Sequence, residues 1–303
     1  MSDYHNDRPR ILFLTVGDRN WASSRMRSYW TADIMPEADV MQFSPDSVIP
    51  DDYDVYVWMK TADTVTMRRH AALGKLSFVE TCDPNWWFQP NQIREIVDIV
   101  TAVVGANQPS LDDLLKWYGT DKRAYVIPDR LNLDHFPIVR QHDNVDPVRL
   151  IWYGVANNRV AMFGIIPVLE RLAANGVKFE FTICDNAPNA QFIQTDKFQV
   201  YNTQWALDTE NATIAAHDIA VLPPYPGPWG PLKTNNKVLT AWACGLPAVD
   251  GHDYYQLYDL CTRANRRGYH AHKAYDTLVS EYTTDKTVDD WRRIIATEME
   301  LRK

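Results

Sequence analysis

Short apolar runs alternate with longer amphipathic stretches along the chain, and this alternation occurs twice. In the first half, apolar runs such as 10–16 and 54–59 are separated by helical patterns such as 23–34 and 64–73. The run from Ile11 to Leu14 is continuously apolar, as expected of a strand that is covered on both faces. The alternation predicts an α/β protein whose parallel sheets are flanked by helices.

A polar, proline-containing segment at 128–147 separates the two halves, and we interpret it as a linker. We therefore predict two Rossmann-like, doubly wound domains at 1–145 and 146–303. The last helix, 287–303, is expected to pack back on the first domain. Ligands of open α/β sheets bind at the carboxyl ends of the strands, so the predicted site is a cleft between the two sheets.

The second half carries the same pattern as the first. Its predicted elements in chain order are strand 148–153, helix 160–174, strand 178–183, helix 209–216, strand 218–222, helix 235–243, strand 246–249 and helices 264–281 and 287–301. A glycine just past a helix end is a common stop signal, and Gly176 follows the first of these helices.

Composition excludes several classes of protein. Thirty-one Lys and Arg residues against 39 Asp and Glu residues give a net charge of −8, which argues against a surface built wholly to hold a polyanion. The four cysteines are scattered without CxxC spacing and lie in apolar segments, so we expect buried, reduced thiols and a cytoplasmic location. No apolar stretch is long enough to predict a transmembrane helix.

The first candidate for a binding site is a segment in the second half. It consists of a strand, a loop rich in proline and glycine, and a helix. The strand ends near Val221, and the first helical turn holds Asn235, Asn236 and Lys237. Unpaired N–H groups at a helix N-terminus, with Lys233 and Lys237 nearby, suit a diphosphate. The alternative interpretation is that both lysines are simply solvated.

The same segment resembles a known family. The matching stretches are Asp218-Ile-Ala-Val-Leu-Pro, Pro228-Trp229, Lys233, Lys237 and Ala241-Trp-Ala-Cys-Gly-Leu-Pro247. This pattern resembles the donor-binding region of glycosyltransferases with the GT-B fold, most nearly the retaining family 4. Three further stretches agree in order: 22–27 after Gly17, 126–137 and 150–155.

The resemblance implies a GT-B fold and transfer of a sugar from a nucleotide sugar, such as a UDP-sugar, to an acceptor hydroxyl. It implies no bound metal and no cofactor beside the nucleotide-sugar co-substrate, because Lys233 and Lys237 would stabilise the departing diphosphate. The residues expected to bind the donor are Gly154, Arg159, Trp229, Asn235, Asn236 and Thr240. For Gly154 a simple tight turn, and for Arg159 a solvated helix start, are the alternative interpretations.

The sequence also departs from the family. The family has two glutamates eight positions apart around this loop and helix, and the aligned residues here are Leu232 and Thr240. A single hydroxyl is a weaker partner for the donor than a carboxylate. This departure leaves open a non-catalytic GT-B relative that binds nucleotide sugar or glycan as a sensor or partner subunit. A nucleotide-sugar epimerase would need acid and base residues that the sequence does not place.

Candidate acceptor residues lie in the first half. Arg25 and Arg27 follow the first strand, and Trp86 and Trp87 follow a later one, beside Asp83. Aromatic rings stack on sugar faces, so we expect the tryptophans to bind a saccharide and Asp83 to be the catalytic carboxylate that binds its hydroxyl. The alternatives are exposed arginines at a helix start and tryptophans that pack the domain interface.

The acceptor itself stays open. A lipid-linked or surface saccharide is the first expectation, with peripheral membrane contact through Trp and Arg side chains. A modified DNA base is disfavoured by the net charge, although Arg25 and Arg266 keep it open. His70 is predicted on a solvated helix face, and the cluster around His270 and His272 has no third ligand at a suitable spacing for a metal.

Overall fold

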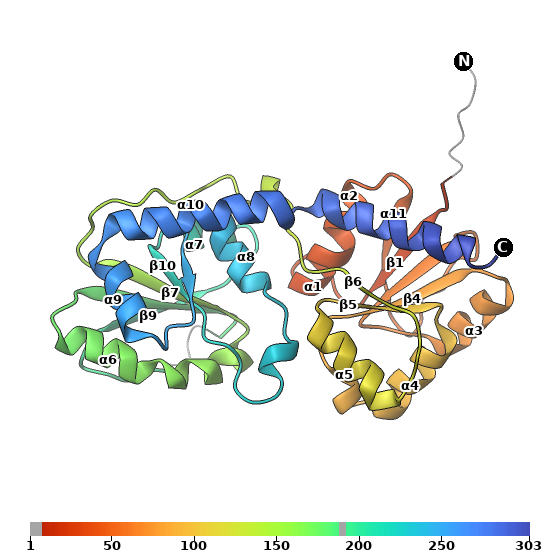
Figure 1. The fold of residues 1–303 in the computed structure, drawn as a ribbon, viewed down its shortest axis with the longest axis horizontal. Coiled ribbons are helices and arrows are strands. Elements are labelled where there is room, and N and C mark those ends of the chain that lie inside the picture. The colour runs from red at the N-terminus through yellow and green to blue at the C-terminus, as the bar shows by residue number, and fades with distance from the viewer. Residues whose placement is uncertain (1–7, 188–191) are drawn as a thin grey trace, which may run out of the picture. The chain divides into compact units, whose positions relative to one another are not determined.

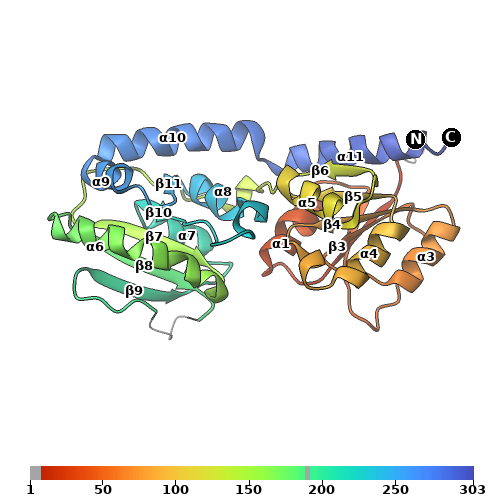
Figure 2. The ribbon, with the colours of Figure 1, turned by 60° about the horizontal axis from the view of Figure 1, so that its bottom comes forward.

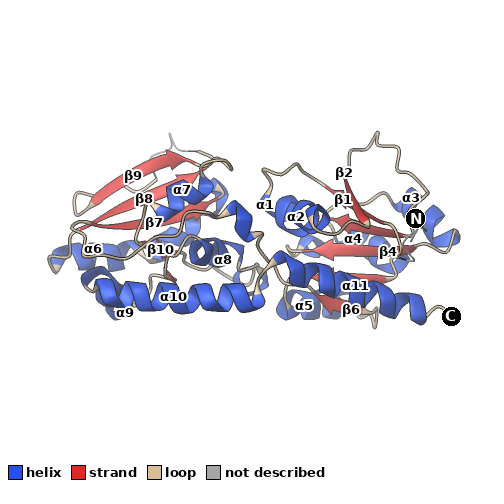
Figure 3. Cartoon of the chain, turned by 90° about the horizontal axis from the view of Figure 1, so that it is seen from above, coloured by secondary structure: helices blue, strands red, loops and turns tan. Residues whose placement is uncertain are grey.

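The computed structural model describes residues 8–187 and 192–303, which form two compact units. The first unit contains the described residues up to Leu131 together with 231–234 and 284–303, and the second contains 132–230 and 235–283. The chain thus leaves the first unit within the predicted linker and returns to it twice (Figure 1). Each unit has one parallel sheet with helices beside it, which confirms the predicted α/β fold class (Figure 3).

The sheet of the first unit has six parallel strands in the order β2-β1-β3-β4-β5-β6. Their bounds are β1 (Ile11–Thr15), β2 (Ala38–Gln42), β3 (Val55–Met59), β4 (Leu76–Thr81), β5 (Ala102–Gly105) and β6 (Ala124–Val126). Met59 pairs with both Thr15 and Glu80, so β1, β3 and β4 end at the same edge of the sheet. Residues that directly follow these strands therefore share that edge.

Helical segments cover both faces of this sheet. They are α1 (Ala22–Ser24), the π-helical turn η1 (Arg25–Tyr29), α2 (Trp30–Asp33), α3 (Thr64–Ala72), the 3-10 turn η2 (Asn85–Trp87), α4 (Pro90–Ile99), α5 (Gln108–Tyr118) and α11 (Thr284–Glu300). The predicted helix 23–34 is thus interrupted by a π-helical turn, which buries four consecutive residues, 25–28.

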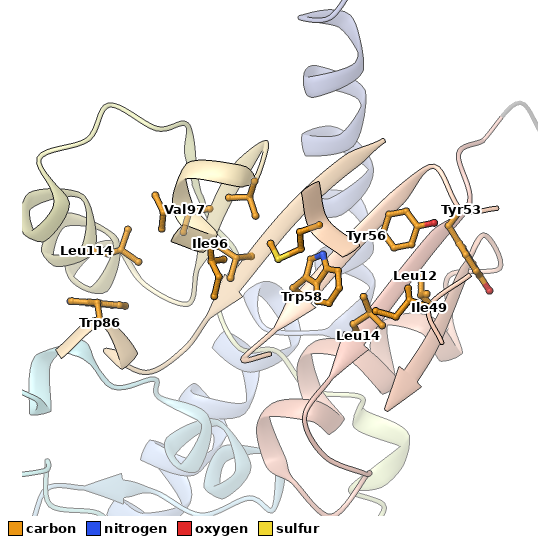
Figure 4. Packing of buried hydrophobic residues seen from close by; sticks show 14 of the residues in the cluster. Leu12, Leu14, Ile49, Tyr53, Tyr56, Trp58, Trp86, Ile96, Val97 and Leu114 are labelled. Atoms are coloured by element: carbon orange, nitrogen blue, oxygen red, sulfur yellow. The ribbon is translucent and has the colours of Figure 1, made fainter. Parts of the chain in front are cut away.

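The period-two alternation of a strand gives this unit two cores. Leu12 and Leu14 of β1 pack with residues of α3, α4 and α5, and Figure 4 shows part of this cluster, including Trp58 and Trp86. The intervening residues of β1 face α11 on the other side, where Trp291 is fully buried. The Trp291 ring lies 5.6 Å from the ring of Phe13, edge to face.

The second unit has five parallel strands in the order β11-β10-β7-β8-β9. The strands are β7 (Val148–Gly154), β8 (Phe179–Asp185), β9 (Gln199–Gln204), β10 (Ile219–Val221) and β11 (Ala248–Val249). The helical segments are η3 (Leu133–His135), η4 (Ala156–Gly164), α6 (Ile166–Ala174), α7 (Glu210–Ala215), α8 (Asn236–Ala243), α9 (Tyr254–Thr262) and α10 (Ala264–Glu281); the short turn η5 (Gly230–Leu232) begins in this unit and ends in the first. Figure 2 shows α8 between α10 and β7.

Two predictions about local structure need correction, and two elements were missed. The helix predicted at 160–174 is a 3-10 segment followed by α6, because Gly164 weakens the helix and Pro167 starts a new one. Strand β9 and helix α9 were not predicted. His70 is not solvated but fully buried, stacked 3.7 Å from the Tyr56 ring, with Nε2 2.9 Å from Asp51.

The four cysteines are all buried and none forms a disulfide, as predicted. Within the described residues, we find no helix whose length and apolar character would let it cross a bilayer.

Candidate active site

Three charged side chains meet at the carboxyl edge of the first unit's sheet. Lys60 directly follows β3, and Asp83 lies two residues after β4. The Lys60 ammonium forms an ion pair with Asp83 Oδ2, and Lys233 Nζ lies 3.8 Å from Asp83 Oδ1. All three side chains are partly exposed, at 20%, 24% and 30% in that order. The structure therefore brings together two of the predicted catalytic residues and adds a lysine that the sequence did not reveal.

Lys60 has an unusual backbone and a partly buried side chain. Its φ of 54° makes it the one non-glycine residue with positive φ among residues 8–187 and 192–303. Burial lowers the pKa of Lys60, but Cys82 and Asp83 raise it by more, so the pKa lies above its ordinary value. Burial also raises the pKa of the Cys82 thiol to about 11. Lys60 is thus a charged lysine beside a neutral thiol.

Asn107 fixes Lys233 in the first unit. Its side-chain amide donates hydrogen bonds to the carbonyl oxygens of Leu232 (3.3 Å) and Lys233 (3.1 Å). The other end of this side chain accepts from Ser110 N–H at 2.8 Å and caps α5. Leu232 is itself buried. A four-residue segment, 231–234, thus belongs to the first unit although its sequence neighbours belong to the second.

The predicted acceptor tryptophans share one carboxylate. Trp86 and Trp87 donate from Nε1 to Asp113 Oδ2, at 2.7 and 2.9 Å. Trp86 is fully buried and lies beside Leu114 in the core (Figure 4), so it packs the interior of the first unit. Trp87 is partly buried and Phe88 is exposed, so these two rings are better placed to meet a ligand.

A small cavity of about 50 Å³ lies at the end of β4. Lys60, Thr81 and Asn85 line its polar side, and Trp86 and Ile93 line its apolar side. The volume suits a few water molecules, each of which needs roughly 15 Å³ measured in this way.

The predicted acceptor arginines are buried. Arg27 donates to Glu80 (Nε to Oε1, 2.9 Å), to Asp129 (2.6 Å) and to the carbonyl oxygen of Ile127 (2.8 Å). Burial lowers the pKa of Arg27, but the two carboxylates raise it above its ordinary value. Arg25 donates to the carbonyl oxygen of Arg19 at 2.8 Å. These contacts tie the π-helical turn to the sheet, so the interpretation as exposed helix-start arginines is wrong and direct acceptor contact stays a prediction.

In the second unit, Lys237 lies in the first turn of α8, against the end of β7. Its ammonium is 5.3 Å from the centre of the Trp152 ring, and the Tyr153 hydroxyl donates to its carbonyl oxygen. Gly154 ends β7 with a φ of 154°, and a Cβ placed there would lie 3.5 Å from Lys237 Cδ. Glycine is therefore favoured here by the backbone angle rather than by crowding around an added Cβ atom.

The other predicted donor residues lie in α8 or in the loop before it. Asn235 precedes the helix without capping it through its side chain. The Thr240 hydroxyl donates to the carbonyl oxygen of Asn236 at 3.0 Å, so its proton is used within the helix. Trp229 lies with its ring 5.8 Å from that of Tyr225.

Arg159 is held by a protein carboxylate. It donates through Nη2 to Asp185 Oδ1 (2.7 Å) and to the carbonyl oxygen of Ala187 (2.6 Å), and both Arg159 and Asp185 are buried. Arg159 is therefore not a solvated helix start. Its predicted contact with the donor phosphates stays a prediction and would have to compete with Asp185.

Sequence reasoning missed Lys60, Asn107 and Asp185. Lys60 directly follows a strand and Asp185 ends one at the sheet edge that carries function, so strand ends were the usable signal for both. Asn107 is an N-cap followed two residues later by Pro109, which indicates a helix start. The sequence does not indicate that the Asn107 side chain also binds the carbonyl oxygens of Leu232 and Lys233. Among the described residues, no cluster of His, Cys, Asp and Glu could hold a metal ion.

No family model matches the sequence, and no curated protein matches it. Solved structures match over nearly the whole chain at low identity. HepE of Anabaena, solved with UDP and glucose, matches with a TM-score of 0.66 and 9% identity over 95% of this chain and all of that one. An alpha-glucosyltransferase, solved with UDP and DNA that contains an HMU base, matches with a TM-score of 0.67 and 10% identity over 95% of this chain and 99% of that one. Sucrose-phosphate synthase from Thermosynechococcus elongatus matches with a TM-score of 0.62 and 10% identity over 96% and 100%. The chain therefore has the GT-B glycosyltransferase fold, as predicted.

Proposed function

We propose that this protein is a glycosyltransferase that moves a sugar from a nucleotide sugar, with a UDP-sugar as first candidate, to an acceptor hydroxyl. The observation that carries the proposal is the position of Lys237: a cation in the first turn of α8, beside the carboxyl end of β7, in a GT-B fold. Helix N-terminal N–H groups together with an ammonium form a setting for a diphosphate. HepE, which has a similar fold, has been solved with UDP and glucose and with UDP-glucose.

In the proposed reaction, the bond between the sugar C1 and the diphosphate oxygen breaks, and its electron pair leaves with the diphosphate. The acceptor oxygen forms the new bond to C1 and loses its proton, which the departing phosphate accepts. Lys237 stabilises the charge on the leaving group where other enzymes use a metal ion. Retention at C1 follows from the family resemblance.

The acceptor side of the proposal rests on Asp83. This carboxylate is partly exposed and lies between Lys60 and Lys233 at the carboxyl edge of the sheet. Its oxygens suit a hydroxyl donor, and Trp87 and Phe88 follow it closely in the chain with rings that can stack on a sugar. We therefore favour a saccharide acceptor, including a lipid-linked one, over a DNA base.

A non-catalytic GT-B relative is the second candidate, because the positions of the family's two glutamates offer no carboxylate. Leu232 is buried, and the Thr240 hydroxyl is bonded to its own helix. Such a protein would bind a nucleotide sugar without breaking it.

Two measurements test the proposal. A panel of nucleotide sugars is screened for thermal stabilisation, because a ligand that binds only the folded form raises the melting temperature. The stabilising sugar is then incubated with the protein, with and without saccharide acceptors, and release of nucleoside diphosphate is measured. Stabilisation with release supports the enzyme, and stabilisation without release under any condition supports the second candidate. A panel without a single stabilising member contradicts both.

A further inference from the structure

We propose that Lys60 is a positioning residue, which holds the Asp83 carboxylate in place for the acceptor. This inference rests on the proposed function. Lys60 lies outside the stretches that carry the family resemblance, and it acts through Asp83 rather than through direct contact with the sugar.

The backbone of Lys60 is the first observation. A left-handed backbone is unfavourable for an L-residue, and glycine or asparagine adopts it more easily. At Lys60 the chain is held by the β3–β4 pairing, and its N–H donates to the carbonyl oxygen of Glu80 at 3.2 Å. Strain of this kind persists where the surrounding structure imposes it, and such positions cluster at functional sites. Lysine has no conformational advantage at this position. The reason that lysine occurs here must therefore be the chemistry of its side chain.

The side chain of Lys60 is the second observation. Its ammonium pairs with Asp83 Oδ2. The backbone of Asp83 is held separately, because its carbonyl oxygen accepts from the Thr81 hydroxyl (2.8 Å) and from the Asn85 N–H (2.8 Å). The main chain of Asp83 is therefore fixed without Lys60, and the ammonium acts on the direction of the carboxylate alone.

The chain offers a matched control at the opposite end of the same strands. Lys75 precedes β4, its side chain is 24% exposed, and its Nζ lies 3.7 Å from Asp54 just before β3. Lys75 and Lys60 thus have the same chemistry and comparable exposure. Only Lys60 lies at the carboxyl edge.

The test uses the full chain and measures steady-state release of UDP from UDP-glucose, with water as acceptor. Lys60→Met is expected to lower kcat about tenfold with KM for UDP-glucose unchanged, because the loss falls on the acceptor side. Asp83→Asn is expected to lower kcat about 100-fold. The kcat of the double variant should be no lower than that of Asp83→Asn alone, since Lys60 acts through Asp83. Lys60→Arg should restore most of the rate, and Lys75→Met should leave it unchanged.

Two outcomes overturn the inference: a Lys60→Met rate equal to that of Lys75→Met, or losses that multiply in the double variant. A wild-type protein that no nucleotide sugar of the panel stabilises is a failure of the proposed function, and it is seen before any variant is made. If another nucleotide sugar stabilises the protein, that sugar replaces UDP-glucose in the test.

A second comparison needs no turnover. Lys60→Gly and Lys60→Ala both remove the ammonium, but only glycine relieves the backbone. Lys60→Gly should therefore melt higher than Lys60→Ala by about 2–4 °C. Equal melting temperatures contradict the strained backbone on which the inference depends.

Discussion

The Lys237 ammonium lies 5.3 Å from the centre of the Trp152 ring, which places a cation of α8 over an aromatic residue of β7. The Trp152 ring is fully buried, and the neighbouring Tyr153 hydroxyl donates to the carbonyl oxygen of Lys237. Two consecutive residues of β7 therefore hold Lys237: Tyr153 binds its carbonyl oxygen, and Trp152 lies against its ammonium. A lysine held this way has a defined position before any ligand arrives, which reduces the cost of ordering it on binding.

Lys237→Ala should remove about 3 kcal/mol of transition-state stabilisation, or roughly a 100-fold loss of kcat. The reason is the loss of positive charge where the diphosphate leaves. Turnover of the nucleotide sugar identified by thermal stabilisation is the measurement. Lys178→Ala is the control, because Lys178 precedes β8 at the other end of the second unit's sheet and is mostly exposed. Equal turnover in the two variants would rule out the role proposed for Lys237.

Arg159 and Asp185 form a buried ion pair, and breaking it should destabilise the protein. Arg159→Ala leaves an uncompensated buried carboxylate, so the free energy of unfolding should fall by about 3–5 kcal/mol. Urea denaturation followed by fluorescence gives this value. Arg94→Ala, which breaks an exposed pair with Asp98, should cost less than about 1 kcal/mol. Similar losses in both variants would show that Arg159 is not held as the structure describes.

Stability should fall as the pH is lowered from 7 to 5. Burial lowers the pKa of His70, His142 and His217 below the ordinary value of 6.5. The unfolded chain then binds more protons than the folded one below about pH 6.5, so protonation favours unfolding and stability rises with pH. Urea denaturation at several pH values measures the slope.

The variant His70→Phe tests the contribution of one histidine to this slope. It removes the proton-binding group and keeps a ring against Tyr56, so the slope should become shallower. His272→Phe is the control, because the His272 side chain is 81% exposed. A slope unchanged by His70→Phe would contradict the buried, neutral histidine.

Trp291 should carry much of the stability that α11 gives to the first unit. The ring is fully buried and lies 5.6 Å from the rings of both Phe13 and Phe78. Trp291→Ala should lower the free energy of unfolding by about 3–5 kcal/mol through lost burial and the cavity left behind. Leu301→Ala, at an exposed position just beyond the helix, should change it by less than about 0.5 kcal/mol. Comparable values for the two would exclude the packing of α11 described above.

The regular elements were largely predictable, because periodicity is a local property of the sequence. Helix α10 has the predicted bounds, and β1 and β3 lie within the predicted runs 10–16 and 54–59. Strand β9 was missed because its residues are mostly polar and half-exposed at the edge of a sheet. His70 was misplaced because its burial depends on Tyr56 and Asp51, which a helical pattern does not include.

The candidate site was less predictable for a similar reason. Lys233 and Lys237 lie four residues apart in the sequence, yet the structure assigns them to different units. Lys233 belongs with Asp83 because of two hydrogen bonds from Asn107, more than 100 residues away in the chain. Buried pairs such as Arg27 with Glu80 and Arg159 with Asp185 likewise join distant positions. Pattern reasoning found the charged residues but not their partners.

The return of α11 to the first unit has a consequence for biosynthesis. The β-strands of that unit are all made within the first 126 residues, but one face of their sheet stays uncovered until Val288, Trp291 and Ile294 have left the ribosome. The unit translated first is therefore completed last. A nascent or prematurely terminated chain would expose Phe13 and Phe78 to the solvent, where chaperones and proteases recognise such surfaces.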